Sequence, residues 1–280
     1  MRHESRAQVA PICARRRHQR IQPGMSKALV LKLVLALLCL VLACGDSGDS
    51  PSPSEPWNYV ALGDSLAFGA LASSGYVPRY ADYARSDSGR PLTLTNLGVN
   101  GWTSTDLLNA LRSDTLFRQA IANANLITWD IGGNDLLRAR ARFQNGTCGG
   151  ADNQECFRQA VITFRANWDG IVREIAALRS GNSTALRTFD LYYPFVAQDK
   201  ASGVFQTLSA YLEQVNAHIH AGAAANSYRV GRVFEAYNGS SGEEDPVAKG
   251  LISIDGFHPN DEGHKAIADQ LRLLGYAPLL

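Results

Sequence analysis

The chain has 280 residues, of which 45% are hydrophobic and 19% are charged, a composition typical of a globular protein with one large core. Residues 1–44 carry eight Lys and Arg against one acidic residue, which leaves 19 basic and 25 acidic residues from residue 45 onward. This mildly acidic body argues against nucleic-acid binding, which needs clustered Lys and Arg to neutralise phosphates.

The N-terminal segment is typical of an export signal. Residues 33–43 form an apolar run of eleven that follows Lys27 and Lys32, in the order of the charged and hydrophobic regions of a signal peptide. The run is too short to span a bilayer, which takes about 20 apolar residues. Because Met25 begins a normal signal by itself, we interpret residues 1–24 as an upstream extension.

The end of this signal, Val41-Leu42-Ala43-Cys44, resembles a bacterial lipobox. In such a motif the cysteine is lipidated and becomes the N-terminus, so Cys44 would tether the protein to a membrane surface without spanning it. Cleavage after Ala43 without lipidation is the alternative, because Val41 and Leu42 are not the usual residues of the motif. Residues 45–57 are rich in Gly, Ser and Pro and are predicted to form a flexible linker.

From residue 58 to residue 280 the sequence predicts one domain in which strands alternate with helices. The predicted strands, which are short apolar or β-branched runs, are 57–62, 92–99, 126–131, 186–193 and 228–234. The predicted helices, with apolar residues at helical spacing, are 76–85, 105–111, 116–124, 157–178, 204–225 and 260–274. This alternation favours a mostly parallel sheet with helices on both faces.

Polar or glycine-rich turns follow each of the first three predicted strands. These turns are Gly63-Asp64-Ser65, Asn100-Gly101 and Gly132-Gly133-Asn134-Asp135. In parallel sheets, ligands bind beyond the carboxyl ends of the strands, so the three turns are expected to converge on one binding edge. Ester hydrolysis needs a nucleophile, a base, a group that orients the base and donors for the oxyanion, and each has a candidate in the chain.

Ser65 is the candidate nucleophile, because a turn at the end of a strand projects its hydroxyl into the crevice. Taken alone, Ser65 is better explained as a cap of the next helix. The tripeptide Gly-Asp-Ser also occurs at 45–47 and 48–50. Those copies lack a preceding strand and a following Leu, so only Gly63-Asp64-Ser65-Leu66 has the right context.

His258 is the candidate base. Pro259 disfavours a helical conformation at His258, which places this side chain in a loop before the last helix, with Asn260 as the N-cap. Asp255 lies three residues earlier, where its carboxylate can fix the imidazole tautomer and stabilise the imidazolium. The alternative is a loop of solvated polar residues.

The other histidines of the domain are assigned no catalytic role, and no metal site is expected. His218 and His220 are two residues apart in a predicted helix and therefore point in different directions. His264 is expected at the surface or in helix packing. Cys148 and Cys156, eight residues apart in a Gly- and Asn-rich loop, are expected to form a disulfide in an oxidising compartment, with a metal pair as the alternative.

Gly101 and Asn134 are the candidate oxyanion donors, together with the Ser65 backbone N–H. A glycine lets its N–H approach a substrate closely, and an Asn amide supplies two donors without charge. Ordinary turn residues are the alternative interpretation for both positions.

Four sequence blocks together resemble the SGNH/GDSL hydrolase family. They are Gly63 to Leu66, Asn96 to Gly101, Gly132 to Asp135 and Asp255 to His258, in the family's order. The resemblance implies an α/β fold, a flavodoxin-like three-layer α/β/α sandwich around a five-stranded parallel sheet. It also implies a catalytic triad of Ser65, His258 and Asp255, an oxyanion hole of Ser65, Gly101 and Asn134, and no metal or organic cofactor. Gly98 competes with Gly101, which is preferred because it lies nearer the polar turn.

We therefore expect an exported serine hydrolase that cleaves small-molecule or lipid esters, at a membrane surface if Cys44 is lipidated and otherwise secreted or periplasmic. The alternatives are a carbohydrate O-deacetylase or acyltransferase of the same fold, and a non-catalytic surface-binding lipoprotein. A loop over 138–154 and the segment 237–253 are expected to frame the pocket.

Overall fold

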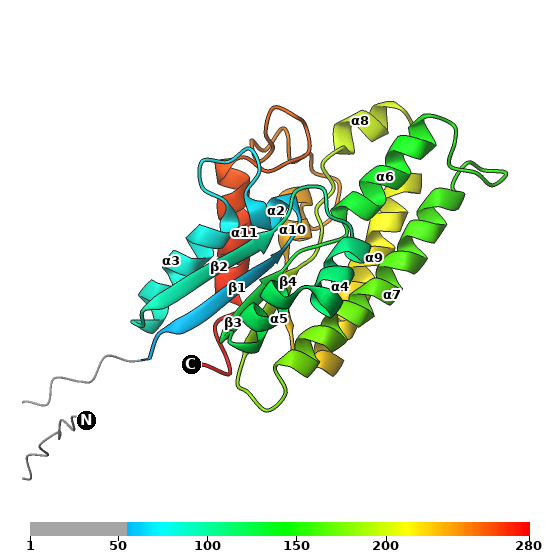
Figure 1. Ribbon diagram of the computed structural model, residues 1–280. Coiled ribbons are helices and arrows are strands. Elements are labelled where there is room, and N and C mark those ends of the chain that lie inside the picture. The colour runs from blue at the N-terminus through cyan, green and yellow to red at the C-terminus, as the bar shows by residue number, and fades with distance from the viewer. Residues whose placement is uncertain (1–54) are drawn as a thin grey trace, which may run out of the picture. The chain divides into compact units, whose positions relative to one another are not determined.

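A five-stranded parallel sheet forms the centre of the computed structural model, which describes residues 55–280 (Figure 1). Its strands, in the spatial order β2-β1-β3-β4-β5, are β2 (Leu92–Gly98), β1 (Trp57–Gly63), β3 (Leu126–Trp129), β4 (Ala185–Phe189) and β5 (Arg229–Gly231). This flavodoxin-like order has its switch point between β1 and β3, where ligands bind in such sheets. The predicted fold class is confirmed. The predictions for the export signal, Cys44 and nearly all of the linker lie outside the described residues.

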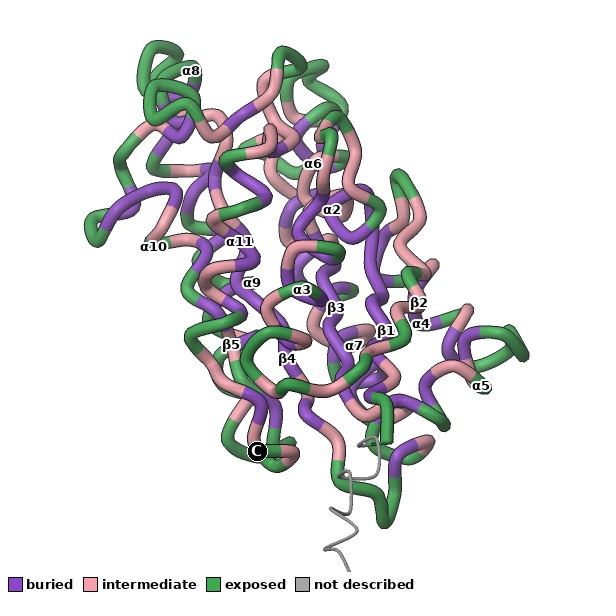
Figure 2. Tube along the Cα trace, turned by 90° about the vertical axis from the view of Figure 1, so that its left-hand side faces the viewer, coloured by how far each residue is buried: buried purple, intermediate pink, exposed green. Residues whose placement is uncertain are grey.

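Helices cover both faces of the sheet (Figure 1). One face carries α4 (Ser104–Ser113), α5 (Thr115–Ala122), α6 (Gly133–Gln144), α7 (Glu155–Leu178) and α9 (Phe205–Asn226). The other face carries α3 (Tyr76–Ser88), α10 (Val233–Asn238) and α11 (Asp261–Leu273). Two short helices, α2 (Ser65–Phe68) and α8 (Val196–Ala201), follow β1 and β4. The strands β1, β3 and β4 are buried for most of their length (Figure 2), as their near-continuous apolar sequences require.

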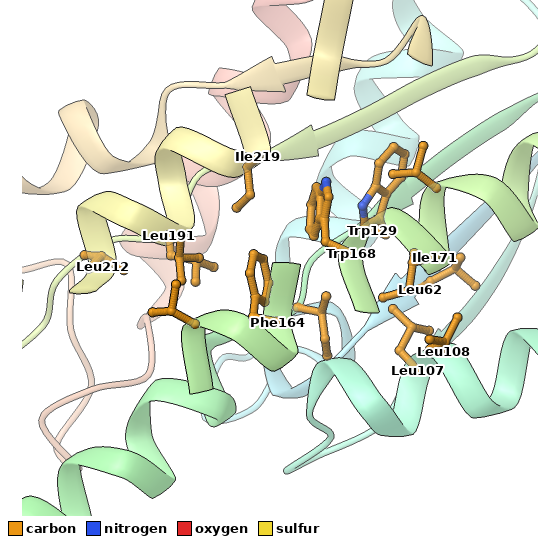
Figure 3. Packing of buried hydrophobic residues seen from close by; sticks show 14 of the residues in the cluster. Leu62, Leu107, Leu108, Trp129, Phe164, Trp168, Ile171, Leu191, Leu212 and Ile219 are labelled. Carbon is orange, nitrogen blue, oxygen red and sulfur yellow. The ribbon is translucent and has the colours of Figure 1, made fainter. Parts of the chain in front are cut away.

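The face that carries α7 is packed mainly with apolar side chains. Apolar residues of α7 recur at helical spacing, and Phe164, Trp168 and Ile171 are fully buried against the sheet. The Trp168 ring lies 5.9 Å from that of Trp129 on β3. Figure 3 shows this cluster extending from Trp168 to Leu191, near the carboxyl edge of the sheet. Each such side chain contributes about 1.5–3 kcal/mol on burial.

The opposite face buries aromatic residues that have polar groups. Tyr59, Tyr76, Tyr80 and Tyr237 are fully buried there, and His264 of α11 is buried beside them. The Tyr59 hydroxyl shares a hydrogen bond of 2.8 Å with the Thr128 hydroxyl. Among the described residues, however, the hydroxyls of Tyr80 and Tyr237 have no hydrogen-bond partner, which makes their burial costly.

Two predicted strands end three or more residues before their predicted ends. The strand predicted over 186–193 ends at Phe189, because the side-chain amide of Asn216 pairs with both the N–H and the C=O of Leu191 at 2.8 Å. The strand predicted over 228–234 ends at Gly231, and α10 follows. The Asp190 carboxylate accepts the Phe234 N–H at 2.7 Å and so supports the start of that helix.

The prediction of a loop over 138–154 was wrong for residues 138–144. Residues 133–144 form α6, and only the segment after Gln144 is a loop. Three arginines at alternate positions, 138, 140 and 142, obscure the apolar spacing of this helix. The third predicted strand is confirmed, although it ends at Trp129 and not at Ile131.

Candidate active site

The turn after β1 places Ser65 at the carboxyl edge of the sheet. Gly63 ends the strand with φ +147°, and a Cβ there would lie 2.5 Å from the Asp130 carbonyl oxygen, so only glycine fits. The Asp64 carboxylate then accepts the Leu66 N–H at 3.0 Å and caps α2. Ser65 is thus the first residue of a helix, and Asp64, not Ser65, is the cap.

Three predicted residues form a continuous hydrogen-bonded relay. Ser65 Oγ lies 2.8 Å from His258 Nε2, and His258 Nδ1 lies 2.5 Å from Asp255 Oδ2. The other Asp255 oxygen accepts the backbone N–H groups of Phe257 and His258 at 3.2 and 3.1 Å. Partial burial raises the pKa of Asp255, but the hydrogen bonds from the His258 ring and the two N–H groups outweigh it, so that the pKa is lowered. The carboxylate therefore stays ionised beside the imidazole.

Hydrogen bonds from two different segments hold the loop that carries His258. The Ser253 N–H donates to the His258 carbonyl at 2.7 Å, and the Tyr192 hydroxyl donates to the Phe257 carbonyl at 2.5 Å. Asn260 caps α11 by accepting two backbone N–H groups at 3.0 Å, as predicted. The imidazole is thus positioned by the start of α11 on one side and by the segment after β4 on the other.

Asn134 lies beside Ser65 in the lining of one pocket. It is the second residue of α6, and its Nδ2 donates to the Trp102 carbonyl at 2.9 Å and to Asp64 Oδ2 at 3.3 Å. These two acceptors fix the orientation of the amide. The turn that contains Gly101 is attached to the same helix, because Arg138 donates to the Gly101 carbonyl at 3.0 Å.

The two neighbouring glycines, Gly98 and Gly101, have different surroundings. The Gly98 N–H is used, because it donates to Asn96 Oδ1 at 3.0 Å, and a Cβ at Gly98 would collide with the backbone of Phe68 in α2. Close packing therefore explains Gly98. Gly101 has φ +78° and open space around its missing side chain. These contacts favour Gly101 as the donor that a substrate reaches.

A buried carboxyl pair behind Ser65 was missed from the sequence. Asp130 accepts the Tyr76 hydroxyl at 2.5 Å and the Asp64 N–H at 3.3 Å. Burial and the charge of Asp130 raise the pKa of Asp64 well above its usual range, and burial raises the pKa of Asp130 to about 6. Two carboxyl groups this close favour a shared proton. The available signal was Asp130 itself, an acid between Trp129 and Ile131 in an apolar run.

An apolar pocket of about 100 Å³ opens beside Ser65 and His258. Its walls come from α6, α7, α9 and the segment after β4, and include Leu136, Leu137, Arg140, Phe157, Leu191, Tyr193, Phe195, Leu208 and Leu212. The expectation that the segment 237–253 frames the pocket was wrong, because none of its residues lines it. Phe257, which precedes His258 in the loop before α11, lines the pocket instead.

The remaining polar candidates lie apart from this pocket. His218 pairs with Asp169 at 2.8 Å and His220 with Asp190 at 2.9 Å. His264 is buried in the core, where its Nδ1 accepts the Tyr76 N–H at 3.2 Å. Burial lowers the pKa of His264 to about 4. Within residues 55–280, no group of three or more His, Cys, Asp or Glu side chains is arranged to hold a metal ion.

Cys148 and Cys156 are bonded to each other through their sulfur atoms, with their Cα atoms 4.8 Å apart, as the predicted disulfide requires. They connect the loop after α6 to the first turn of α7. None of the helices in the described part of the chain has both the length and the hydropathy of a membrane-spanning segment.

A family model and a curated relative both match this chain. The model of a family described as GDSL-like Lipase/Acylhydrolase matches residues 59–271. A spore germination lipase, LipC of Bacillus licheniformis, is 25% identical over 226 residues, which cover 79% of this chain and 97% of the relative.

Two solved structures share the fold. The lipase Lip_vut3 from a goat rumen metagenome has a TM-score of 0.64 at 24% identity, covering 80% of this chain and all of that chain. Axe2, an acetylxylan esterase from Geobacillus stearothermophilus, has a TM-score of 0.55 at 18% identity, covering 78% of this chain and 94% of that one.

Proposed function

The chain belongs to the GDSL-like lipase and acylhydrolase family and hydrolyses carboxylic esters; we propose that it does so through an acyl-enzyme on Ser65. The observation that carries this proposal is the relay from Ser65 Oγ to His258 Nε2 at 2.8 Å and from His258 Nδ1 to Asp255 at 2.5 Å. A nucleophile, a base and an orienting carboxylate at these distances are the parts that acyl transfer requires.

The reaction has two halves. His258 Nε2 takes the proton of Ser65 as Oγ attacks the acyl carbon, and the ionised Asp255 stabilises the imidazolium. The oxyanion forms against the N–H groups of Ser65 and Gly101 and against the Asn134 amide, which donates to it by giving up the 3.3 Å hydrogen bond to Asp64 Oδ2. His258 then protonates the departing alcohol, which leaves an ester of the acid with Ser65. A water molecule, deprotonated by His258, attacks that ester, and His258 returns the proton to Ser65 Oγ as the acid is released.

Ser65→Ala tests this assignment. We expect nitrophenyl butyrate hydrolysis to fall by about 10⁶ and labelling by a fluorophosphonate probe to disappear, with an unchanged circular dichroism spectrum. The matched control is Ser47→Ala, which removes the serine of another Gly-Asp-Ser tripeptide and should keep both labelling and activity. A folded Ser65→Ala variant that still reacts with the probe contradicts the proposal and favours another nucleophile.

Export and a lipid anchor on Cys44 complete the proposed function. Support comes from the apolar run before Ala43-Cys44 and from the bonded Cys148–Cys156 pair, since disulfides persist in oxidising compartments. Mass spectrometry of the mature protein tests the anchor: a lipid-bearing N-terminal Cys44 is expected. An N-terminal peptide that contains intact Ala43-Cys44 would overturn it.

A further inference from the structure

Leucines of two helices line much of the pocket beside Ser65, which we call the channel. From α6, Leu136, Leu137 and Arg140 line one wall, at a spacing that places them on adjacent positions of one helical side. From α9, Leu208 and Leu212, four residues apart, line the facing wall. Such walls attract hydrocarbon, because each methylene group that leaves water gains roughly fourfold in binding.

The charged residue of this channel is neutralised. Both terminal nitrogens of Arg140 donate to the two carboxylate oxygens of Asp199, and the Tyr193 hydroxyl donates to the same carboxylate. The guanidinium also lies 4.1 Å from the centre of the Phe195 ring. Arg140 and Asp199 are both buried. The pair therefore joins α6 to α8 and leaves no net charge among the leucines.

A second hollow lies at the surface next to this ion pair. It measures about 460 Å³ and is lined by Asp199, Leu208, Phe143 and Val204 and by the exposed residues Gln144, Gln198, Ala201 and Ser202. Leu208 borders both spaces, whereas Arg140 faces the channel and Asp199 faces the second hollow. The Arg140–Asp199 pair and Leu208 therefore form a partition between the two spaces.

We propose that the Arg140–Asp199 pair is the end wall of an acyl-binding channel and limits the substrate to esters of medium-length fatty acids, with hexanoyl as the preferred acyl group. The proposal rests on the proposed function, since it takes Ser65 as the acylated residue. A cavity of about 150 Å³ holds benzene, so the present 100 Å³ receives a few methylene groups. An acetyl group would leave the leucines uncovered. A palmitoyl chain would have to displace a buried ion pair, which is strongly unfavourable.

The test is the acyl-chain profile of the purified full chain on nitrophenyl acetate, butyrate, hexanoate, octanoate, laurate and palmitate. We expect kcat/KM to rise on the order of a hundredfold from acetate to hexanoate and to fall again beyond octanoate. In Arg140→Ala/Asp199→Ala both charges are removed together, so neither is left buried without its partner. This double variant joins the channel to the second hollow and should raise the laurate-to-hexanoate ratio at least tenfold.

Two further variants secure the interpretation. Arg272→Ala/Asp87→Ala removes an ion pair between α11 and α3, away from the channel, and should keep the parental profile. Leu212→Phe narrows the channel and should lower the hexanoate-to-acetate ratio. It tests the channel even if the Arg140/Asp199 double variant fails to fold.

The outcomes separate the two proposals. A parental enzyme that prefers acetate, or a folded Arg140/Asp199 double variant with the parental profile, overturns the end wall and leaves the role of Ser65 intact. A parental enzyme that neither reacts with the fluorophosphonate probe nor hydrolyses any ester of the series would instead refute the role of Ser65.

Discussion

The two helical layers that cover the sheet differ in what they bury. The pocket layer, made of α4, α5, α6, α7 and α9, packs hydrocarbon around Trp129 and Trp168 and continues into the leucines of the channel. The relay layer, made of α3, α10 and α11, buries tyrosine hydroxyls and His264, and His258 lies just before its α11. The leucine-lined wall of the pocket and the relay are thus built mainly by different layers. The layers meet at Ser65 and also at Phe257 and His258, which line the pocket as well. Changes in one layer should therefore alter one function and spare the other.

The largest expected effect comes from removing the charge of the relay. Asp255→Asn should lower kcat by roughly 10⁴, because the amide holds the wrong imidazole tautomer and cannot stabilise the imidazolium. The acyl-chain profile should stay parental, since no channel residue changes. Steady-state kinetics on the ester series measures both quantities. Asp269→Asn, which alters a carboxylate of α11 that pairs with Lys265 at 2.7 Å, is the control; a changed profile in Asp255→Asn would break the division between layers.

The next largest effect is expected from two matched substitutions that each create a cavity, one in each layer. Ile171 in α7 and Ile267 in α11 are both fully buried, so replacement of either by Ala should lower the free energy of unfolding by about 2–5 kcal/mol. Ile267→Ala should also lower kcat roughly tenfold, because α11 positions His258, whereas Ile171→Ala should keep kcat. Urea unfolding and kcat measured well below the unfolding temperature give both values. Equal kcat in the two variants would show that the relay tolerates movement of α11.

The smallest effect is a pH dependence of stability. The pKa of Asp130 is raised to about 6 in the folded protein, above that of an unfolded Asp near 3.9. Between these values the folded chain holds a proton that the unfolded chain has released, so this residue's contribution to stability falls as pH rises from about 4 to about 6. Asp130→Asn should lose the part of the decline that Asp130 contributes, whereas buried Asp64, whose pKa is also raised, keeps its own part. Thermal melts of both proteins from pH 4 to pH 8 measure the difference. A constant difference in Tm over this range would contradict the shared proton.

The sequence predicted the fold class and the members of the relay because their signals are local. A strand that ends in Gly63-Asp64-Ser65 and a proline after His258 determine their own turns. The ends of β4 could not be predicted in this way, because the side chain of Asn216 on α9 takes the bonds that a sheet neighbour would have used. The pairing of Asp130 with Tyr76 likewise depends on residues 54 positions apart. The channel was also missed, since it requires α6 and α9 to face each other.

The direction of β1 separates the start of the domain from the edge that carries Ser65. The strand runs seven residues from Trp57 to Gly63, and at about 3.3 Å per residue this separates the two ends of the strand by roughly 20 Å. Ser65 follows the far end, so the chain enters the sheet at the edge opposite the relay. An attachment upstream of Trp57 would therefore join the domain at the end of the strand that lies away from Ser65.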